Sequence, residues 1–414
     1  MPSLATNWAG NHTYRAASIA HPTSLDELSS LVAGSSRIRA LGSRHSFSDL
    51  TDTEGVLVDL AGLAPDIRID PGSATVSLGG GVRYGPLCRA LEAQGWALAN
   101  LASLPHISVA GAVATGTHGS GDRNGSLASA VASLEVMGPD GESRRVERGD
   151  PDFEGSVVAL GALGIVTRLE LDIEPTYLVR QEVRTGLTWA TVEKYFDDIT
   201  SAGYSVSLFT RYDEQTVDQL WVKSRSEEPP VEDLFDTLPA AETMHMIRGG
   251  SVDAVTAQGG VTGPWLDRLP HFRMEFTPSA GEELQSEYFI PRQHAVSAVE
   301  ALRGIAASLT PLLHVAEIRT VAPDQHWLSG AYGRDTVAFH FTWVRDEPAV
   351  RALVRDVERV LAPLEPRPHW GKVFEMQAPA LARAFPRLAD FAALRRRVDP
   401  DGVFGNAFLE RVLP

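Results

Sequence analysis

The turn around His45 is the part of the sequence that points most directly to chemistry. The run Arg39-Ala-Leu-Gly-Ser-Arg-His45-Ser places a glycine-containing turn directly after a short apolar segment, with a histidine at its tip. Successive backbone N–H groups in such a turn form a concave array that suits a phosphate or pyrophosphate. A histidine held there can contact the organic group that carries the phosphates. We therefore expect an anionic cofactor at this turn.

A second polar loop in the same half of the chain strengthens this interpretation. It reads Ala102-Ser-Leu-Pro-His106-Ile-Ser-Val-Ala-Gly-Ala-Val-Ala-Thr-Gly-Thr-His118-Gly-Ser-Gly. A single turn or loop histidine more often satisfies nearby backbone groups than binds a ligand. Two loops rich in small residues, hydroxyls and histidines favour a binding site over structural punctuation.

Polar side chains alternate along two predicted strands in the second half. Glu317 and Arg319 point to one face of the first strand, and His340 and Thr342 share a face of the second. If the strands are neighbours, the four side chains form one polar patch. A solvated outer face of an antiparallel sheet is the alternative. The mixture of an acid, an arginine, a histidine and a hydroxyl favours a site that binds a polyhydroxylated molecule through directional hydrogen bonds.

Length, charge and cysteine usage exclude several classes of protein. The chain has 414 residues, so two domains are expected. A net charge of −16 disfavours a nucleic-acid partner. The lone cysteine, Cys88, excludes an intramolecular disulfide and a cysteine-rich metal site, and no metal is expected. Neither a secretory signal nor an apolar run of membrane length is found, so we expect a cytoplasmic monomer that does not bind membranes.

Hydrophobic periodicity and glycine and proline boundaries predict the helices and strands that carry these residues. A capping box at Ser24 predicts an amphipathic helix that continues through Leu31. Further helices are predicted at 84–94, 151–159, 190–201, 294–308 and 348–361. After a short apolar segment at 38–41, strands are predicted at 56–60, 74–78, 131–137, 143–146 and 165–173, then near 178 and at 205–211, 219–224, 287–290, 314–321 and 336–344. Residues 227–239 read as a surface loop.

Fingerprints of several common enzyme classes are absent from the sequence. It contains no Gly-x-Gly-x-x-Gly dinucleotide motif, no Walker A loop, no His-Glu-x-x-His helix and no Gly-x-Ser-x-Gly elbow. The elements also mix helices and strands without strict alternation, which predicts an α+β fold. Its second half is expected to be built on one large antiparallel sheet.

Taken together, these residues resemble the vanillyl-alcohol-oxidase superfamily of flavoenzymes, whose FAD-binding domain is of the PCMH type, and within it the alditol oxidases, which are related to the sugar-lactone oxidases. The resemblance covers nearly the whole chain. Its main elements are Gly42-Ser-Arg-His45-Ser, the 102–121 loop, Glu317-x-Arg319, His369-Trp-Gly-Lys372 and Asp399-Pro-Asp-Gly-Val-Phe-Gly-Asn406. It implies a two-domain α+β flavoenzyme, with an FAD-binding domain over residues 10–176 and a substrate domain over residues 177–414. The last ~40 residues are expected to pack back on the FAD-binding domain.

The resemblance also implies roles for individual residues. His45 is expected to bond covalently to the 8α-methyl group of the FAD isoalloxazine. The other expected cofactor contacts are Ala40, Leu41, Gly42, Ser43, Arg44, Ser46, Ser103, Ser108, Gly111, Thr115, Gly116, Thr117, His118 and Val166. The substrate is expected to contact Ser103, Glu317, Arg319, Thr342 and Lys372. The expected catalytic residues are Lys372, Arg319 and His340, and Ala102 is the expected gatekeeper that lets O₂ reach the reduced flavin.

The implied reaction converts the terminal CH₂OH group of an alditol, such as xylitol or sorbitol, to the aldose while O₂ is reduced to H₂O₂. A sugar-1,4-lactone oxidase or dehydrogenase of the same fold is one alternative. A flavin-binding protein without polyol turnover is another. The sequence does not identify the catalytic base, although burial beside Arg319 would lower the pKa of Lys372 and suit it to that role. His271, His294 and His326 are interpreted as residues without a chemical role.

Overall fold

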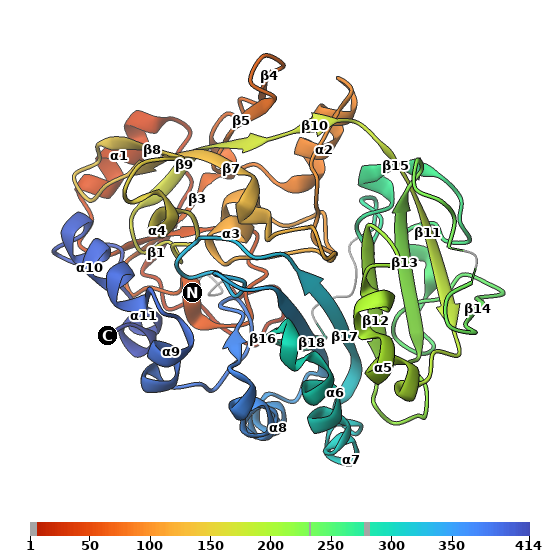
Figure 1. Ribbon diagram of the computed structural model, residues 1–414. Helices are drawn as coiled ribbons and strands as arrows, with labels where there is room; N and C mark the ends of the chain where they lie inside the picture. Colours follow the sequence, from red (N-terminus) through yellow and green to blue (C-terminus); the bar gives the residue numbers. More distant parts are fainter. Residues whose placement is uncertain (1–5, 232, 277–281) are drawn as a thin grey trace.

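The computed structural model describes residues 6–231, 233–276 and 282–414. Its first half forms a parallel sheet in the order β1-β3-β2 and an antiparallel sheet in the order β4-β5-β9-β7-β8 (Figure 1). Two short strands of the same half, β6 (Trp96–Ala97) and β10 (Glu174–Pro175), pair with each other in a separate two-stranded sheet. The strands of the two sheets are β1 (Ser18–Ala20), β2 (Ile38–Leu41), β3 (Val56–Asp59), β4 (Arg68–Asp70), β5 (Thr75–Gly79), β7 (Val131–Met137), β8 (Ser143–Glu147) and β9 (Ile165–Asp172).

The second half is organised around one large antiparallel sheet. Its strand order is β14-β11-β13-β12-β17-β18-β16-β19, and β15 also pairs with β11. The strands are β11 (Leu178–Thr185), β12 (Ser205–Thr210), β13 (Gln219–Arg225), β14 (Leu238–Pro239), β15 (Gly263–Pro264), β16 (Glu283–Pro291), β17 (Leu313–Val321), β18 (Thr336–Val344) and β19 (Arg367–Pro368). The predicted α+β class, with a large antiparallel sheet in the second half, is thereby confirmed.

Helices cover the outer face of this large sheet. They are α5 (Trp189–Thr200), α6 (Ala295–Arg303), α7 (Ala306–Leu309) and α8 (Glu347–Leu361), and Figure 1 shows them together at the lower edge of the molecule. The apolar members of the alternating strands, including Ile318, Phe339 and Phe341, pack into one core with Val299 of α6 and Val354 of α8. Because side chains alternate across a strand, the polar members of the same strands must face the opposite side, toward the first half.

The α-helices in the described part of the first half are α1 (Leu25–Ala33), α2 (Tyr84–Glu92), α3 (Val109–Ala114) and α4 (Phe153–Val157). The predicted cap of α1 is confirmed, because the Ser24 hydroxyl accepts from the Glu27 N–H at 3.2 Å. The Glu27 carboxylate bonds to the N–H of Thr23 at 2.8 Å. Helix α3 lies inside the segment interpreted as a loop, so that interpretation was wrong for residues 109–114.

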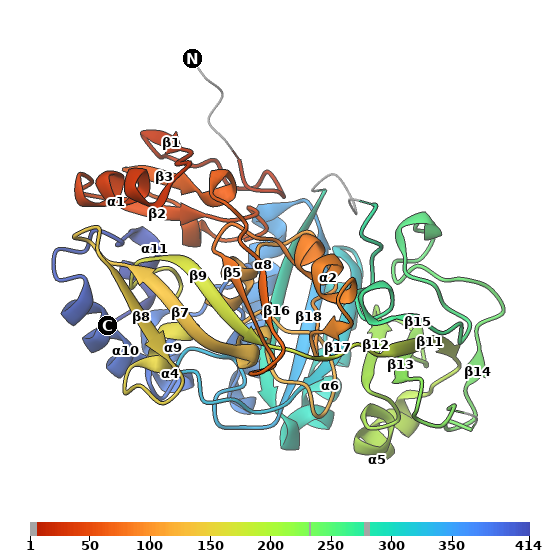
Figure 2. The same ribbon diagram turned by 90° about the horizontal axis from the view of Figure 1, so that it is seen from above.

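The C-terminal segment returns to the first half through three helices, α9 (Ala378–Ala384), α10 (Leu388–Val398) and α11 (Ala407–Val412). Figures 1 and 2 both place them beside α4 and away from the large sheet. The N–H of Ile38 donates to the carbonyl of Val403 at 2.9 Å, and the Asn406 amide donates to the carbonyl of Leu50 at 2.9 Å. These three helices were not predicted from the sequence.

Other predicted elements are found with changed bounds. Strands β7 and β18 match the predicted ranges, but the strand predicted at 287–290 begins earlier, at Glu283. The helix predicted at 294–308 is divided into α6 and α7, because Gly304 ends the first of them. No helix among the described residues is long and apolar enough to cross a membrane.

Candidate active site

A cavity of about 520 Å³ lies between the two halves of the molecule. One side, here called the first wall, consists of residues 40–46 and 102–118. The other side, the second wall, consists of β16, β17, β18 and residues 369–372. A cavity of this size lies within the range of small-molecule and cofactor sites, roughly 300–1,000 Å³.

The first wall is built around the His45 turn. Arg44 adopts a left-handed backbone conformation, with φ of 63°, which turns the chain sharply before the histidine. The imidazole stacks on Trp8 with ring centroids 5.2 Å apart, and its Nδ1 lies 3.0 Å from the carbonyl oxygen of Ser43. Burial lowers the pKa of His45 to about 4. The ring is therefore neutral near pH 7 and keeps a nitrogen lone pair.

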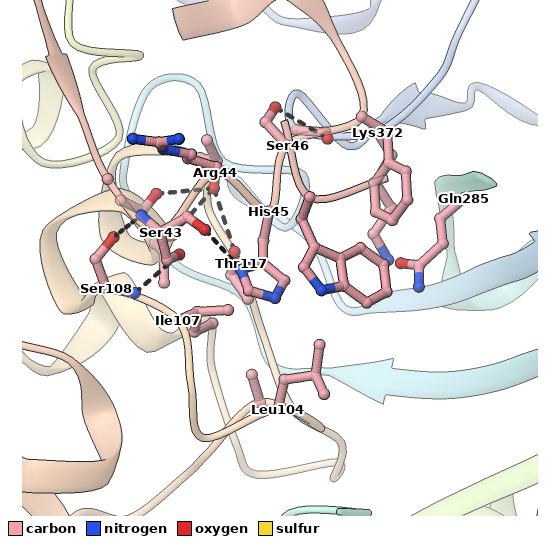
Figure 3. A pocket seen from close by; sticks show the side chains of 18 of the residues that line it. Ser43, Arg44, His45, Ser46, Leu104, Ile107, Ser108, Thr117, Gln285 and Lys372 are labelled. Atoms are coloured by element: carbon pink, nitrogen blue, oxygen red, sulfur yellow. Dashed lines mark hydrogen bonds between the residues drawn. The ribbon is translucent and has the colours of Figure 1, made fainter. Parts of the chain in front are cut away.

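Two serines tie the two loops of the first wall together (Figure 3). The N–H of Ser108 donates to the hydroxyl of Ser43 at 3.2 Å, and the N–H of Ser43 lies 3.4 Å from the hydroxyl of Ser108. A Cβ added to Gly42 or to Gly111 would lie only 2.6 Å from that Ser108 hydroxyl. The wall is thus a cradle of backbone and small polar groups, which fits the close approach of a dinucleotide pyrophosphate.

The second wall is the polar face that the alternation predicted. Strands β17 and β18 are neighbours, and Glu317 lies opposite His340 in their register. All four predicted side chains line the cavity and are buried, with exposures between 4% and 8% (Glu317, Arg319, His340 and Thr342). The alternative of a solvated outer face is therefore wrong.

A third strand extends this face with residues that sequence reasoning missed. In β16, Gln285 lies opposite Thr342 and Glu287 lies opposite His340. The Nε2 of His340 lies 3.1 Å from the Gln285 side-chain oxygen. The strand was predicted to begin only at Glu287, so Glu283, Gln285 and Glu287 were not recognised as alternate residues on one face. Their alternation is the sequence pattern that would have placed them on the second wall.

Glu287 is the charged centre of the second wall. Its side chain is 1% exposed and lies 2.8 Å from Lys372 Nζ, 2.6 Å from Arg319 Nη2 and 3.1 Å from His118 Nε2. Burial alone would raise the pKa of this carboxyl group. The charges of Lys372 and Arg319 outweigh burial, and the pKa of Glu287 is held well below its usual range. Glu287 is therefore an anion that anchors both cations.

Lys372 follows β19 and is fixed by its neighbouring backbone. Its N–H donates to the carbonyl of His369 at 3.0 Å, and the next N–H, of Val373, donates to Gln285 at 2.8 Å. Burial lowers the pKa of Lys372, Glu287 opposes that effect, and Arg319 adds to it. The pKa of Lys372 is therefore lowered overall, as expected from the sequence. In Figure 3, Lys372 and Gln285 lie on one side of His45 and the Ser43–Ser108 pair on the other.

The structure brings nearly all the predicted site residues to this one cavity. Every expected cofactor contact borders it except Gly116. Ala102, the expected gatekeeper, also borders it and is 8% exposed. His271, interpreted as chemically silent, lines the cavity too, with its Nε2 2.8 Å from Glu317 Oε1. It comes from an irregular segment whose sequence carries no periodic signal.

Comparisons with known proteins match this arrangement. A family model described as FAD binding domain matches residues 16–147, and one described as D-arabinono-1,4-lactone oxidase matches residues 280–412. The alditol oxidase of Streptomyces sp. is 48% identical over 416 residues, which cover 100% of both chains. The L-gulono-1,4-lactone dehydrogenase of Mycobacterium tuberculosis is 29% identical, also over 100% of both chains.

Among solved structures, the cholesterol oxidase of Brevibacterium sterolicum has the same fold. It matches with a TM-score of 0.79 and covers 99% of this chain and 96% of its own, at 17% identity. The matched FAD-binding domain and the full-length oxidase relative define a flavin-dependent oxidoreductase. Within that class, full-length identity to the Streptomyces enzyme shows that the chain belongs to the alditol oxidase family.

Proposed function

We propose that this protein is an FAD-dependent alditol oxidase, which converts the terminal CH₂OH group of a linear polyol to the aldose and yields H₂O₂. The observation that carries the proposal is the buried second wall, where directional donors and acceptors face the cofactor cradle. An uncharged polyol offers no ionic handle, so it must be oriented by several hydrogen bonds. Full-length identity of 48% to an alditol oxidase supports the same substrate class.

We propose that the first wall holds FAD and that His45 carries it covalently. Residues 10–176 would form the cofactor domain and residues 177–414 the substrate domain, with the C-terminal helices packed on the former. When bound there, FAD would supply the two-electron redox chemistry, by which the hydride of the carbinol carbon would be taken up and O₂ would be reduced to H₂O₂. The neutral imidazole of His45 supports the attachment, because a ring nitrogen must be free to form the bond. The small side chain of Ala102 would leave O₂ a path to the flavin.

The second wall would bind the polyol and manage its proton. Glu317 accepts from substrate hydroxyls, and Ser103, Thr342 and His340 bind others. Arg319 and Lys372 stabilise the developing alkoxide. Lys372 takes the hydroxyl proton when its amine is neutral, a role supported by its lowered pKa. Arg319 is a poor base, because a guanidinium scarcely loses its proton.

A sugar-lactone oxidase or dehydrogenase is the second candidate. The match of residues 280–412 to the arabinono-lactone oxidase model supports it, as does the 29% identical lactone dehydrogenase. The much higher identity to the alditol oxidase favours the polyol.

A substrate panel with peroxide detection separates the candidates. Xylitol, sorbitol, mannitol, glycerol, L-gulono-1,4-lactone and D-arabinono-1,4-lactone would each be supplied to the purified yellow protein in air. We expect peroxide with the alditols and little with the lactones. Peroxide with a lactone alone would favour the second candidate, and a flavin that no substrate reduces would indicate a binding protein without turnover.

A further inference from the structure

Two buried side chains form a chain behind Glu317. Lys223, on β13, is 1% exposed, and His271 is 6% exposed. The Nδ1 of His271 lies 3.2 Å from Lys223 Nζ, and its Nε2 lies 2.8 Å from Glu317 Oε1. This row of hydrogen-bonded side chains therefore runs from the interior of the second half to the cavity.

The hydrogen-bond partners of Lys223 determine which ring nitrogen of His271 carries the proton. Nζ also donates to the carbonyl oxygens of Leu269 and Pro270, the latter at 3.3 Å. A lysine ammonium has three donors and no acceptor, so these two carbonyls and His271 use all three. His271 Nδ1 must then accept. The single proton of a neutral ring is left on Nε2, where it donates to Glu317.

The charges of the three groups favour this arrangement. Burial and the nearby Lys223 lower the pKa of His271 to about 4, so the ring is neutral. Burial also lowers the pKa of Lys223 to about 7, while the charge of Glu317 and the hydrogen bonds to two backbone carbonyls favour the ammonium form. Arg319 and His271 overcome the effect of burial on Glu317 and hold its pKa well below the usual range. Glu317 is thus an anion and needs a donor on the imidazole.

Packing fixes the imidazole in place. Phe209 and Trp221 meet the ring edge to face, with centroids 5.5 Å and 5.3 Å away. The N–H groups of His271 and Phe272 both donate to the carbonyl of Ser103, at 3.2 Å and 3.3 Å. The same short segment therefore sets the positions of Glu317 and Ser103, two expected substrate contacts on opposite walls.

We propose that Lys223 and His271 are positioning residues that hold Glu317 in one orientation for the substrate. Oε1 of Glu317 is occupied by the imidazole N–H. Oε2, which lies 3.6 Å from Arg319 Nε, is left to accept from substrate hydroxyls. This inference rests on the proposed function, in which Glu317 accepts from a polyol.

Two substitutions of His271 separate positioning from mere filling of space. In His271→Gln, an amide N–H can stand near the Nε2 position and still donate to Glu317, whereas in His271→Asn the amide stands near Nδ1 and does not reach it. We expect His271→Asn to raise KM for xylitol about 10- to 100-fold, as loss of a charged hydrogen bond does, with kcat within about twofold. His271→Gln should restore most of the wild-type KM.

His326 supplies a matched control, because it is another buried histidine 2.8 Å from a carboxylate, Glu154, and does not border the cavity. His326→Gln and His326→Asn should leave KM unchanged. Melting temperatures of the paired variants show whether a change in KM follows from misfolding. A wild-type KM in folded His271→Asn overturns the inference.

A spectroscopic measurement tests the hydrogen bonds between Lys223, His271 and Glu317 without substrate. Long-range ¹H–¹⁵N spectra of histidine-labelled protein should show one ring, absent from His271→Gln, as the Nε2–H tautomer. In Lys223→Met the Nδ1 signal of that ring should shift, because its donor is lost, while Glu317 should keep the proton on Nε2. An Nδ1–H ring in the wild type contradicts the inference. Failure of the proposed function would appear differently, as wild-type protein that turns over no polyol.

Discussion

The two walls of the cavity face each other but are built from opposite kinds of group. The first wall uses backbone N–H groups, hydroxyls and a neutral histidine, His45, and its close packing depends on Gly42 and Gly111. The second wall buries charges in pairs, with Glu287 against Lys372 and Arg319. An anionic dinucleotide is held well by N–H donors in a protein of net charge −16, whereas an uncharged polyol needs oriented donors and acceptors. This difference supports the proposal that the first wall holds the cofactor and the second wall binds the substrate.

The largest expected effect falls on the first wall. His45→Ala should abolish covalent attachment of the flavin, because the motif over residues 42–46 contains no second histidine that could form the bond. After acid precipitation, the wild-type pellet should be yellow and the variant pellet colourless, with flavin left in the supernatant. His106→Ala is the matched control, since this loop histidine bonds to the Met274 carbonyl at 3.0 Å and does not border the cavity. A yellow His45→Ala pellet would remove the covalent role.

The next effect belongs to the second wall. Lys372→Met should slow anaerobic flavin reduction by xylitol about 10²- to 10³-fold, the usual cost of losing one donor to a developing oxyanion. Flavin content should stay at the wild-type level. Lys194→Met, at an exposed lysine on α5, should react like the wild type. An unchanged rate in Lys372→Met would exclude this lysine from the mechanism.

A smaller effect is expected at Ala102, on the first wall. Ala102→Leu should slow reoxidation of the reduced flavin by O₂ about tenfold, equivalent to roughly 1.4 kcal/mol at the barrier. The anaerobic reduction step is the internal control and should change less. Stopped-flow mixing of reduced protein with O₂ measures the rate. Reoxidation at the wild-type rate would count against the gatekeeper role.

The smallest effect is a shift in a pH profile. If Lys372 accepts the proton, kcat/KM should rise with pH through an ionisation below the ordinary lysine value, because burial lowers its pKa. Glu287 opposes that lowering, so Glu287→Gln should move the rise to lower pH. Initial rates with xylitol between pH 6 and 10 would measure both profiles. A rise that persists unchanged in Lys372→Met would belong to another group.

The sequence predicted much of the second wall because a strand has a simple period. Alternation placed Glu317 and Arg319 on one face, and the same rule applied to β16 would have added Gln285 and Glu287. It did not predict His271, whose position depends on Lys223 and Ser103, distant in the chain. No local pattern encodes such contacts.

The first wall was predicted differently, through motif resemblance. Turns have no period, so the small residues near His45 suggested only an anion site. The resemblance supplied the cofactor, and the comparisons confirmed the family. The C-terminal helices escaped prediction because their contacts, such as Asn406 with Leu50, join opposite ends of the chain.

Anaerobic mixing of the purified yellow protein with excess xylitol shows whether a flavin on the first wall faces a polyol on the second, as we propose. We expect the visible flavin absorbance to bleach within a single turnover. Admitting O₂ should then restart turnover, with one H₂O₂ formed for each xylitol oxidised. Absorbance that stays unchanged with xylitol and sorbitol, in protein whose flavin dithionite still reduces, would contradict this proposal.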